Sequence, residues 1–596
     1  MSDPAPPPVA TTPAAAAVAQ TAGSPVATHA SVSPAVSLCA IDPSIDFIAD
    51  AKPFRRRDDD PLYRPLRIYS RDPAGSRVRG NEVEVRVPWE PLKPGPIGSM
   101  LGVETDWPDG TRFRPADLED RHLLLSRGLP PSATDPRFHA QMVYAVARLT
   151  YATFQTALGR DPTWSFADSV TGKHRLTLRP FASEEQNSFY DRDRGEVRFG
   201  FFKVTEEPRG RSFSGGYVFT SLSHDVIVHE VTHALLDGLR ARFRIPTRRD
   251  VLGFHEGFAD LVAIFQRFTY RELVRETLRK AGGSLHRAHV LFEVAREFGQ
   301  TTGREGALRS AIEPPETLTT LDDVGNEPHE VGMVLVSAAF EAFDTIYQRK
   351  IARILRVATG RSVPPEDFEP LGDLLDLLAG EASRLAGQFL NLIIRAVDYC
   401  PPVDLSLGEY LRALITADRE LVPDDPWAYR EAWIDSFARR HIVPQGVPTL
   451  TEDALLWTRP RGGPLAIERL AFADLKFSGD PARPAHSAEL RRQAAALGDF
   501  VSASDRFGDF GLALPGRLSE RPMIHSVRTS RRIGPDGQVL FDLVAEITQR
   551  HLLPSDSGEV PFFSGSTVVI GPEGEVRYVI RKGPPDELSS RQAGLA

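Results

Sequence analysis

The stretch Asp225-Val-Ile-Val-His229-Glu230-Val-Thr-His233-Ala-Leu-Leu-Asp237 carries the strongest chemical signal in the chain. Its apolar residues recur at helical spacing, which predicts an α-helix. Residues four apart on a helix lie on one face, so His229 and His233 can direct two imidazole nitrogens toward one metal ion. Glu230 stands beside them, where its carboxylate can reach a water on that metal. The H-E-x-x-H spacing therefore predicts a metal site with an adjacent general base.

A second stretch, Gly253-Phe-His-Glu256-Gly-Phe-Ala-Asp260, follows after a segment with the turn former Pro246. The separation allows a turn and a return helix. Zinc sites of two histidines are commonly completed by a carboxylate, and Glu256 is placed to provide it. Asp260, one helical turn later, can accept the spare N–H of a ligand histidine. The two stretches together predict a Zn²⁺ site.

These stretches resemble the thermolysin-like gluzincin metallopeptidases, whose signature is H-E-x-x-H followed downstream by E-x-x-x-D. The resemblance covers residues 180–445 and is strongest at 225–262. It implies an α+β fold of two lobes, the N-terminal lobe rich in strands and the C-terminal lobe mainly helical. It also implies that Glu230 is the general base of peptide hydrolysis and that Asp260 orients His229.

The segment Gln186–Tyr190 resembles the edge strand of that family, in which an asparagine and the backbone hold the substrate peptide. The resemblance implies that Asn187 and Ser188 bind substrate. An extended peptide can add to the open edge of a strand, where backbone hydrogen bonds hold it irrespective of its sequence. The alternative is that Asn187 is simply a turn residue.

The segment Pro328–Gly332 opens an apolar helix and resembles the part of the family whose histidine stabilises the transition state. The resemblance implies that His329 is catalytic. The alternative is an ordinary histidine at a helix N-terminus.

The chain departs from the family at several places, among them Glu330-Val331-Gly332, which does not reproduce the family's Asn-Ser after the last histidine. Where the family often has a tyrosine that hydrogen-bonds the oxyanion, this sequence has Phe243 and Arg244. Asp225 would suit the calcium site of the family, but Arg267 stands near the position of another calcium carboxylate. We therefore do not predict calcium, and calcium dependence stays undetermined.

The composition is ordinary for a globular chain of 596 residues, with 41% hydrophobic and 25% charged residues. A net charge of −9 argues against a dedicated nucleic-acid binder. The two cysteines, Cys39 and Cys400, stand far apart, so we expect no structural disulfide. We find no uncharged apolar run long enough to span a membrane and no Sec signal. We expect a cytoplasmic protein, with signal-less secretion as the alternative.

Shifts in composition predict four regions. Residues 1–60 are rich in Ala and Pro and then in charge, which indicates a disordered tail and linker. Residues 61–220 are the predicted β-rich lobe, and residues 221–445 the helical zinc-binding lobe. Residues 446–596 are predicted to form a small accessory region of mixed α/β structure, with two β-hairpins that share a Gly-Pro-acidic-Gly turn.

Periodicity predicts individual elements within these regions. We expect a helix over Pro136–Leu158 and strands at Leu176–Phe181 and Gly195–Phe202, on either side of the Asn187 segment. We expect a further helix over Ser284–Phe298.

The sequence thus predicts a zinc metalloendopeptidase that acts on peptide or protein substrates, with Zn²⁺ held by His229, His233 and Glu256. Three alternatives stay open: a zinc aminopeptidase, a non-catalytic zinc-bearing binding protein of the same fold, and a metal-dependent hydrolase of another bond. We expect no nucleic-acid or membrane partner. The substrate, any need for activation, the role of residues 446–596 and the oligomeric state stay undetermined.

Overall fold

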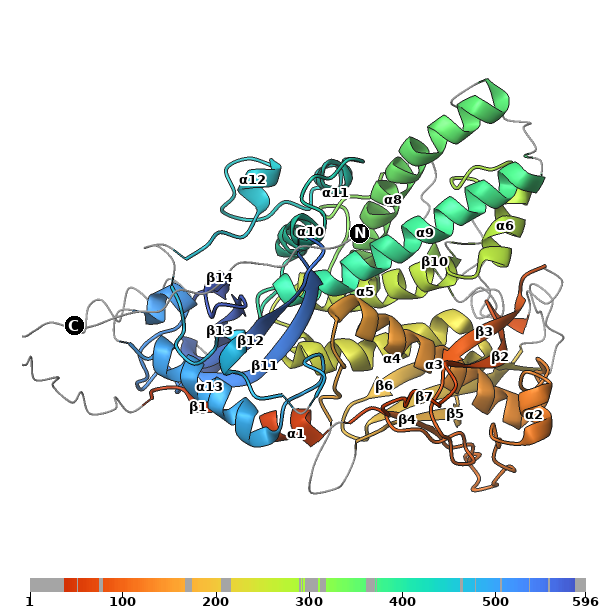
Figure 1. The fold of residues 1–596 in the computed structure, drawn as a ribbon, viewed down its shortest axis with the longest axis horizontal. Helices are drawn as coiled ribbons and strands as arrows, with labels where there is room; N and C mark the ends of the chain where they lie inside the picture. The colour runs from red at the N-terminus through yellow and green to blue at the C-terminus, as the bar shows by residue number, and fades with distance from the viewer. Residues whose placement is uncertain are drawn as a thin grey trace, which may run out of the picture. The chain divides into compact units, whose positions relative to one another are not determined.

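Figure 1 shows the fold as a computed structural model. The structure describes residues 37–50, 52–73, 79–166, 174–204, 216–288, 291, 293–294, 309–310, 318–360, 370, 372–460, 465–477, 479–503, 506–534, 536–555 and 558–584. Most of the predicted tail, residues 1–36, lies outside these ranges. The described chain is of mixed α and β structure, with N-terminal sheets, a central helical region and a C-terminal sheet (Figure 1).

The described residues of the N-terminal region form two sheets. One has the strand order β4-β5-β7-β6, with β8 also paired to β7, and the other is the antiparallel pair β2-β3. Strands β4, β5 and β7 run parallel, whereas β6 runs antiparallel to β7 and forms one end of its sheet. The strands are β2 Tyr63–Tyr69, β3 Glu82–Pro88, β4 Leu101–Val103, β5 Leu176–Glu184, β6 Ser188–Asp191, β7 Glu196–Lys203 and β8 Tyr217–Phe219.

Helix α3 spans Pro136–Leu158, as the periodicity predicts. Asp135 caps its N-terminus by accepting from the backbone N–H of Arg137, with proline at the first helical position, where no N–H is needed. Gly159 ends the helix in the left-handed conformation, at φ 66°, which glycine adopts without steric cost. The helix packs on β2, β3 and β4 and on α4 and α9, so it joins the strands to the helical region.

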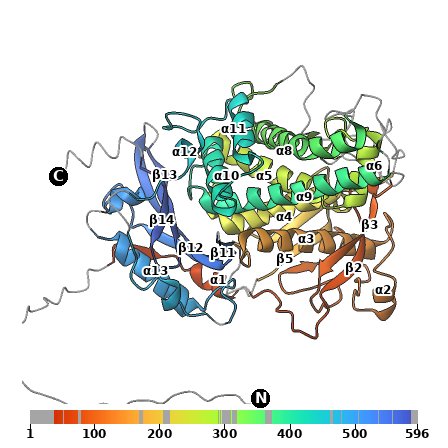
Figure 2. The ribbon, with the colours of Figure 1, turned by 45° about the horizontal axis from the view of Figure 1, so that its top comes forward.

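The central region is helical. Helix α5 packs against α4, α8 and α9, and the four helices share one large hydrophobic core with α3 (Figure 2). The helices of the N-terminal and central regions are α2 Arg121–Leu125, α4 His224–Leu239, α5 Arg249–Arg267, α6 Arg271–Lys280, α8 Pro328–Thr359, α9 Gly372–Ala396, α10 Leu407–Leu421, α11 Tyr429–Arg439 and α12 Glu452–Leu455, with short 3₁₀ turns η2 Thr220–Leu222, η3 Ala241–Arg244 and η5 Val397–Tyr399.

The C-terminal sheet has the order β1-β11-β12-β13-β14. The two predicted hairpins are the antiparallel pairs β11-β12 and β13-β14. Helix α13 packs on one face of this sheet (Figure 2). The elements are β1 Ala40–Ile41, β11 Met523–Ile533, β12 Val539–Ser555, β13 Gly558–Ile570, β14 Val576–Lys582, α1 Ile45–Asp50, α13 Ser487–Val501, η6 Phe472–Asp474 and η7 Phe507–Phe510.

Alternating residues of β13 face two different cores. Val568 and Ile570 pack with α13, whereas Val569 belongs to the large core of the helical region. The hydroxyl of Thr567 donates to the carbonyl of Cys400 at 2.7 Å. Because successive side chains of a strand point to opposite faces, one strand connects the accessory sheet to the central helices.

The chain joins the C-terminal sheet earlier than the composition predicts. Ala40–Ile41 pairs in parallel with β11, and Ile45–Asp50 forms α1 against α13. Both segments fall in the range 1–60 that we expected to be a disordered tail and linker. Ile45 is fully buried, and a short apolar segment that completes a distant sheet edge gives no periodic signal of its own.

The helix predicted over Ser284–Phe298 is wrong for the residues described there. Residues 284–288 form turns, and Glu293–Val294 is strand β9, antiparallel to β10 at Arg309–Ser310. Leu285, Ala288 and Leu291 are buried, and the backbone N–H groups of Ala288 and Leu291 each bond three residues back. Buried apolar residues are thus spaced by three among the described residues, a spacing that resembles a helical pattern.

Two further sequence expectations concern the core and the membrane. Cys39 and Cys400 are both buried and carry free thiols. None of the described helices is long and apolar enough to cross a membrane.

Candidate metal centre

Helix α4 places both histidines of the first stretch on one face. Of its residues, His229 is buried and His233 half-buried, and their Nε2 atoms lie 3.0 Å apart. The apolar side of the helix, including Val228, Val231 and Leu235, is fully buried in the large core. Burial of that side fixes the rotation of α4 and so directs both imidazoles to the same point.

Helix α5 carries the second stretch and is held close to α8 by glycines. A Cβ on Gly257 would lie 2.6 Å from the carbonyl oxygen of Gly332, and one on Gly332 would lie 2.7 Å from the nitrogen of Gly257. Only residues without a side chain allow this approach of the two helices. Glu256 precedes one of these glycines and His329 lies one turn before the other, so the contact brings both side chains to the centre.

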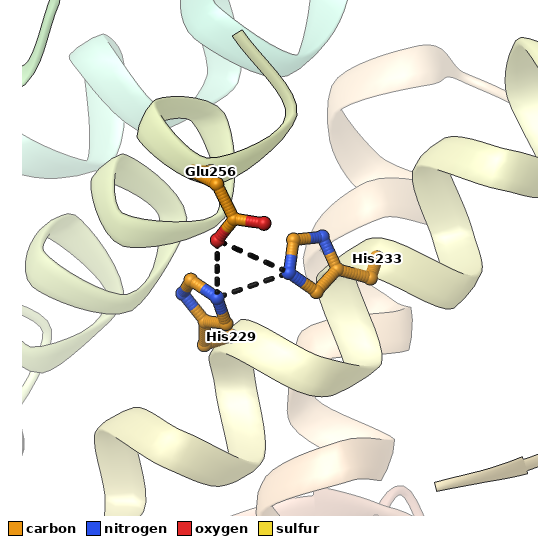
Figure 3. Close-up of side chains that lie close together, drawn as sticks. All are labelled: His229, His233 and Glu256. Atoms are coloured by element: carbon orange, nitrogen blue, oxygen red, sulfur yellow. Dashed lines mark hydrogen bonds and ion pairs between the residues drawn. The ribbon is translucent and has the colours of Figure 1, made fainter. Parts of the chain in front are cut away.

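The three predicted ligands converge (Figure 3). One carboxylate oxygen of Glu256, Oε2, lies 3.2 Å from His229 Nε2 and 3.6 Å from His233 Nε2. One ligand atom from each of the three residues falls within 4.8 Å of the others, which is the spacing of a group that can hold a metal ion. Two imidazole nitrogens and a carboxylate oxygen are a donor set that suits zinc.

Asp260 contacts His229 on the ring nitrogen that faces away from the candidate ligand atoms. Its Oδ1 lies 2.8 Å from His229 Nδ1, and Asp260 is 2% exposed. Such a carboxylate fixes the histidine tautomer and leaves Nε2 with its lone pair for a metal. The position of Asp260 is the one that the resemblance implies.

The electrostatics of the centre favour a cation. Burial alone would lower the pKa of His229, but the carboxylates of Asp260 and Glu256 outweigh it and raise the pKa to about 10. Burial would likewise raise the pKa of Glu256, yet the imidazoles of His233 and His229 hold that pKa well below its usual range. Without a metal, a proton on an imidazole offsets the surplus of negative charge, which a divalent cation can offset instead.

His255 is a member of the site that the sequence analysis does not identify. Its Nδ1 lies 2.7 Å from Nδ1 of His233, the ring nitrogen on the far side from Glu256. The residue is buried, and burial together with the charge of His233 lowers the pKa of His255 well below its usual value. The sequence offered one signal for this role, namely that His255 directly precedes the ligand Glu256. On helix α5 the side chain of His255 lies against the ligand His233.

The two predicted catalytic residues lie on α4 and α8. Glu230 lies on α4 between the two histidines and is 7% exposed. His329 lies in the first turn of α8, and its Nδ1 is 3.3 Å from Oε2 of Glu256. The His329 side chain is 45% exposed, so the His329 side of the group reaches solvent.

The predicted substrate-binding segment lies beside α4. Strand β6 contacts that helix and, in the described chain, pairs only with β7, so its other edge is open. Ser188 donates its hydroxyl to Thr220 at 2.7 Å. The exposed side chain of Asn187 accepts from the backbone N–H of Ser188 at 2.9 Å, which is the local contact expected of a turn residue. The described contacts do not join the Asn187 side chain to the ligand group.

Comparison with known proteins adds no assignment. No family model matches the chain, and no curated protein matches it.

Proposed function

We propose that this protein is a zinc-dependent metallopeptidase that hydrolyses internal peptide bonds, with the two-lobed architecture of the thermolysin-like enzymes and an accessory region at residues 446–596. The observation that carries the proposal is the convergence of His229, His233 and Glu256 within 4.8 Å. Two further observations support it: the Asp260 carboxylate contacts Nδ1 of His229, and Glu230, between the two histidines in sequence, is buried. A purely structural zinc site does not need a buried acid at the position of Glu230.

Three residues are the metal ligands, and two others orient the ligand histidines. His229, His233 and Glu256 would hold Zn²⁺, which would supply a bound water of lowered pKa and Lewis-acid polarisation of the scissile carbonyl. Asp260 keeps the Nδ1 proton of His229 in place, and His255 accepts the corresponding proton of His233. Both imidazoles are thereby held with Nε2 directed inward.

Glu230 and His329 handle protons and charge. Glu230 takes the proton of the attacking water and delivers it to the leaving amine. His329, on the exposed side of the centre, donates a hydrogen bond to the oxyanion that develops on the substrate carbonyl. The open edge of β6 holds the substrate as an added strand, with the backbone of Ser188 as a contact.

The test uses the zinc-loaded protein and two sets of peptides of the same sequences. One set carries blocking groups at both ends, and the other has a free amino terminus. An endopeptidase cuts the blocked and the free peptides at the same internal bonds. Removal of zinc by a chelator abolishes cleavage, and added zinc restores it. Cleavage of the free peptides alone, from the amino end, would contradict the proposal and identify an aminopeptidase.

A further inference from the structure

A cavity of about 420 Å³ lies at the C-terminal end of α4, one helical turn beyond His233. Its walls come from the end of α4 and the adjoining η3, and from α1, residues 163–165, the turn after β6, β11 and β12. Four guanidinium groups line it, those of Arg192, Arg242, Arg244 and Arg528. We call this space the α4-end cavity.

The carboxylates that line the α4-end cavity belong to Asp42, Asp237 and Glu546. Asp42 Oδ2 lies 2.6 Å from Nδ1 of His525. Glu546 accepts a hydrogen bond from Arg240, at 3.2 Å. Both negative charges are therefore engaged by residues that are not among the four arginines.

Asp237, near the end of α4, contacts residues at the end of β6. Its Oδ2 accepts from the hydroxyl of Tyr190 at 3.0 Å and from the hydroxyl of Ser165, and it lies 3.4 Å from Nε of Arg192. Tyr190 belongs to β6, and Arg192 follows directly after that strand. The C-terminal end of β6 therefore lies beside the α4-end cavity, which Arg192 and Asp237 line.

Three arginines of the cavity form no ion pair with a carboxylate of the described residues. Arg528 donates to the carbonyl oxygens of Gly238 and Leu239, the last residues of α4, and its buried Nε has no partner in the described chain. Arg242 stacks on a phenylalanine ring, and Arg244 is exposed. Within the ranges described, neither of these two forms an ion pair with an acidic group.

The cavity has a surplus of positive charge. Burial and the neighbouring guanidinium of Arg160 lower the pKa of Arg528 to about 10. Burial also lowers the pKa of Arg242, although Glu546 and Asp42 oppose that shift. A carboxylate placed between these groups would relieve the repulsion and accept charge-assisted hydrogen bonds, for which the planar guanidinium is well shaped.

The cavity lies within reach of a peptide bound at the metal centre. Asp237 is four residues from His233 on α4, a rise of about 6 Å at 1.5 Å per residue, and an extended peptide covers about 3.3 Å per residue. A chain that pairs with the open edge of β6 therefore reaches the cavity about two to three residues from the bond at the metal.

We propose that the α4-end cavity is a subsite for an acidic side chain of the peptide substrate. The inference rests on the proposed peptidase function, and it names the substrate class: peptides with Asp or Glu about two to three residues from the cleaved bond, on one side of it. Arg242 and Arg244 bind the carboxylate, and Arg192 and Arg528 contribute positive potential.

The first experiment compares kcat/KM for blocked peptides in which one position at a time is Glu, Gln or Lys. Wild type prefers Glu over Gln by about 10- to 100-fold at one position, the range expected for hydrogen bonds to a charged group. In the double variant R242Q/R244Q this ratio falls to about one. Arg517 is exposed and does not line the cavity, so R517Q serves as the matched control and keeps the wild-type ratio. Equal cleavage of the Glu and Gln peptides by wild type would overturn the inference and leave the peptidase intact.

The second experiment needs no turnover. Binding of the Glu and Gln peptides to zinc-loaded E230Q protein is measured by fluorescence anisotropy, with and without R242Q/R244Q, and inorganic phosphate is titrated separately. Tighter binding of the Glu peptide that depends on the two arginines supports the subsite. It does so even if the wild-type protein cuts no peptide, because the absence of wild-type cleavage would refute only the proposed peptidase function. Equal binding of both peptides overturns the inference. So does arginine-dependent binding of phosphate without any preference for the Glu peptide, which would indicate a site for a free anion.

Discussion

The Nδ1 atoms of His255 and His233 lie 2.7 Å apart in the interior of the candidate metal centre. Only one of these two nitrogens can carry the shared proton. When His233 binds a metal through Nε2, its Nδ1 bears the hydrogen and His255 Nδ1 accepts it. His255 is then protonated at Nε2, an atom that is buried and has no hydrogen-bond partner among the described residues. His255 is therefore the counterpart of Asp260, which supports the other histidine.

The role of His255 predicts different outcomes for two substitutions. H255N provides an amide oxygen that accepts from His233, so its zinc affinity stays near that of wild type. H255L leaves the Nδ1 proton of His233 without an acceptor, and we expect zinc affinity to fall by about 10- to 100-fold. Competition with a zinc-binding dye measures both. Wild-type affinity in H255L would show that His255 only fills space.

His329 is predicted to act on the reaction and not on the metal. We expect H329A to lower kcat by about 10²- to 10³-fold, with zinc content and KM little changed, because the lost hydrogen bond forms with charge that develops in the transition state. The neighbouring exposed Glu330 provides the control E330Q. An unchanged kcat in H329A would return His329 to the class of ordinary helix N-terminal histidines.

A buried ion pair stands where the family resemblance would place calcium ligands. Arg267 Nε donates to Asp225 Oδ1 at 3.0 Å, and both side chains are at most 5% exposed. Removing one partner leaves an uncompensated buried charge, so R267M should lower the free energy of unfolding by about 3–5 kcal/mol. R550M breaks an exposed pair with Glu520 and should cost about 1 kcal/mol or less. Denaturant titrations measure both, and rescue of R267M by calcium would contradict the assignment.

His139 predicts a loss of stability in mild acid. It is 1% exposed, with Nδ1 3.1 Å from the Ser221 hydroxyl and Nε2 3.0 Å from the Ala133 carbonyl, and burial lowers its pKa from 6.5 to about 4. His139 takes up a proton more readily in the unfolded chain than in the folded one. The contribution of the neutral imidazole to the free energy of unfolding is therefore fully present above pH 6.5 and is lost as the pH drops toward 4. By pH 5 the loss from this group is about 2 kcal/mol. Denaturation curves at pH 7 and pH 5 should show a smaller difference in H139Q; an equal difference would exclude His139 as its source.

The ligand group was predictable because helical spacing is a local property. His229 and His233 are one turn apart on any helix, and the pair Glu256 and Asp260 repeats the spacing, so the sequence suffices to place four side chains on two helix faces. The same holds for α3, whose proline, capping aspartate and terminal glycine are all local signals.

Features that depend on distant contacts were not predictable. The partnership of His255 with His233 depends on how α5 crosses α4, and the join of Ala40–Ile41 to β11 spans most of the chain. The α4-end cavity likewise draws its walls from segments between Asp42 and Glu546. Periodicity and capping specify each element but not the registry between elements, which tertiary packing decides.

The substitution E230Q in the zinc-loaded protein tests most directly whether Glu230 is the general base. Glutamine keeps the shape of the side chain but cannot take a proton, so we expect zinc content and thermal stability equal to wild type and a loss of internal cleavage of blocked peptides by at least about 10²-fold. This combination of retained metal and lost turnover is the predicted result. Cleavage at the wild-type rate by E230Q with a full complement of zinc would contradict the central claim that Glu230 is the general base of a metal-dependent peptidase.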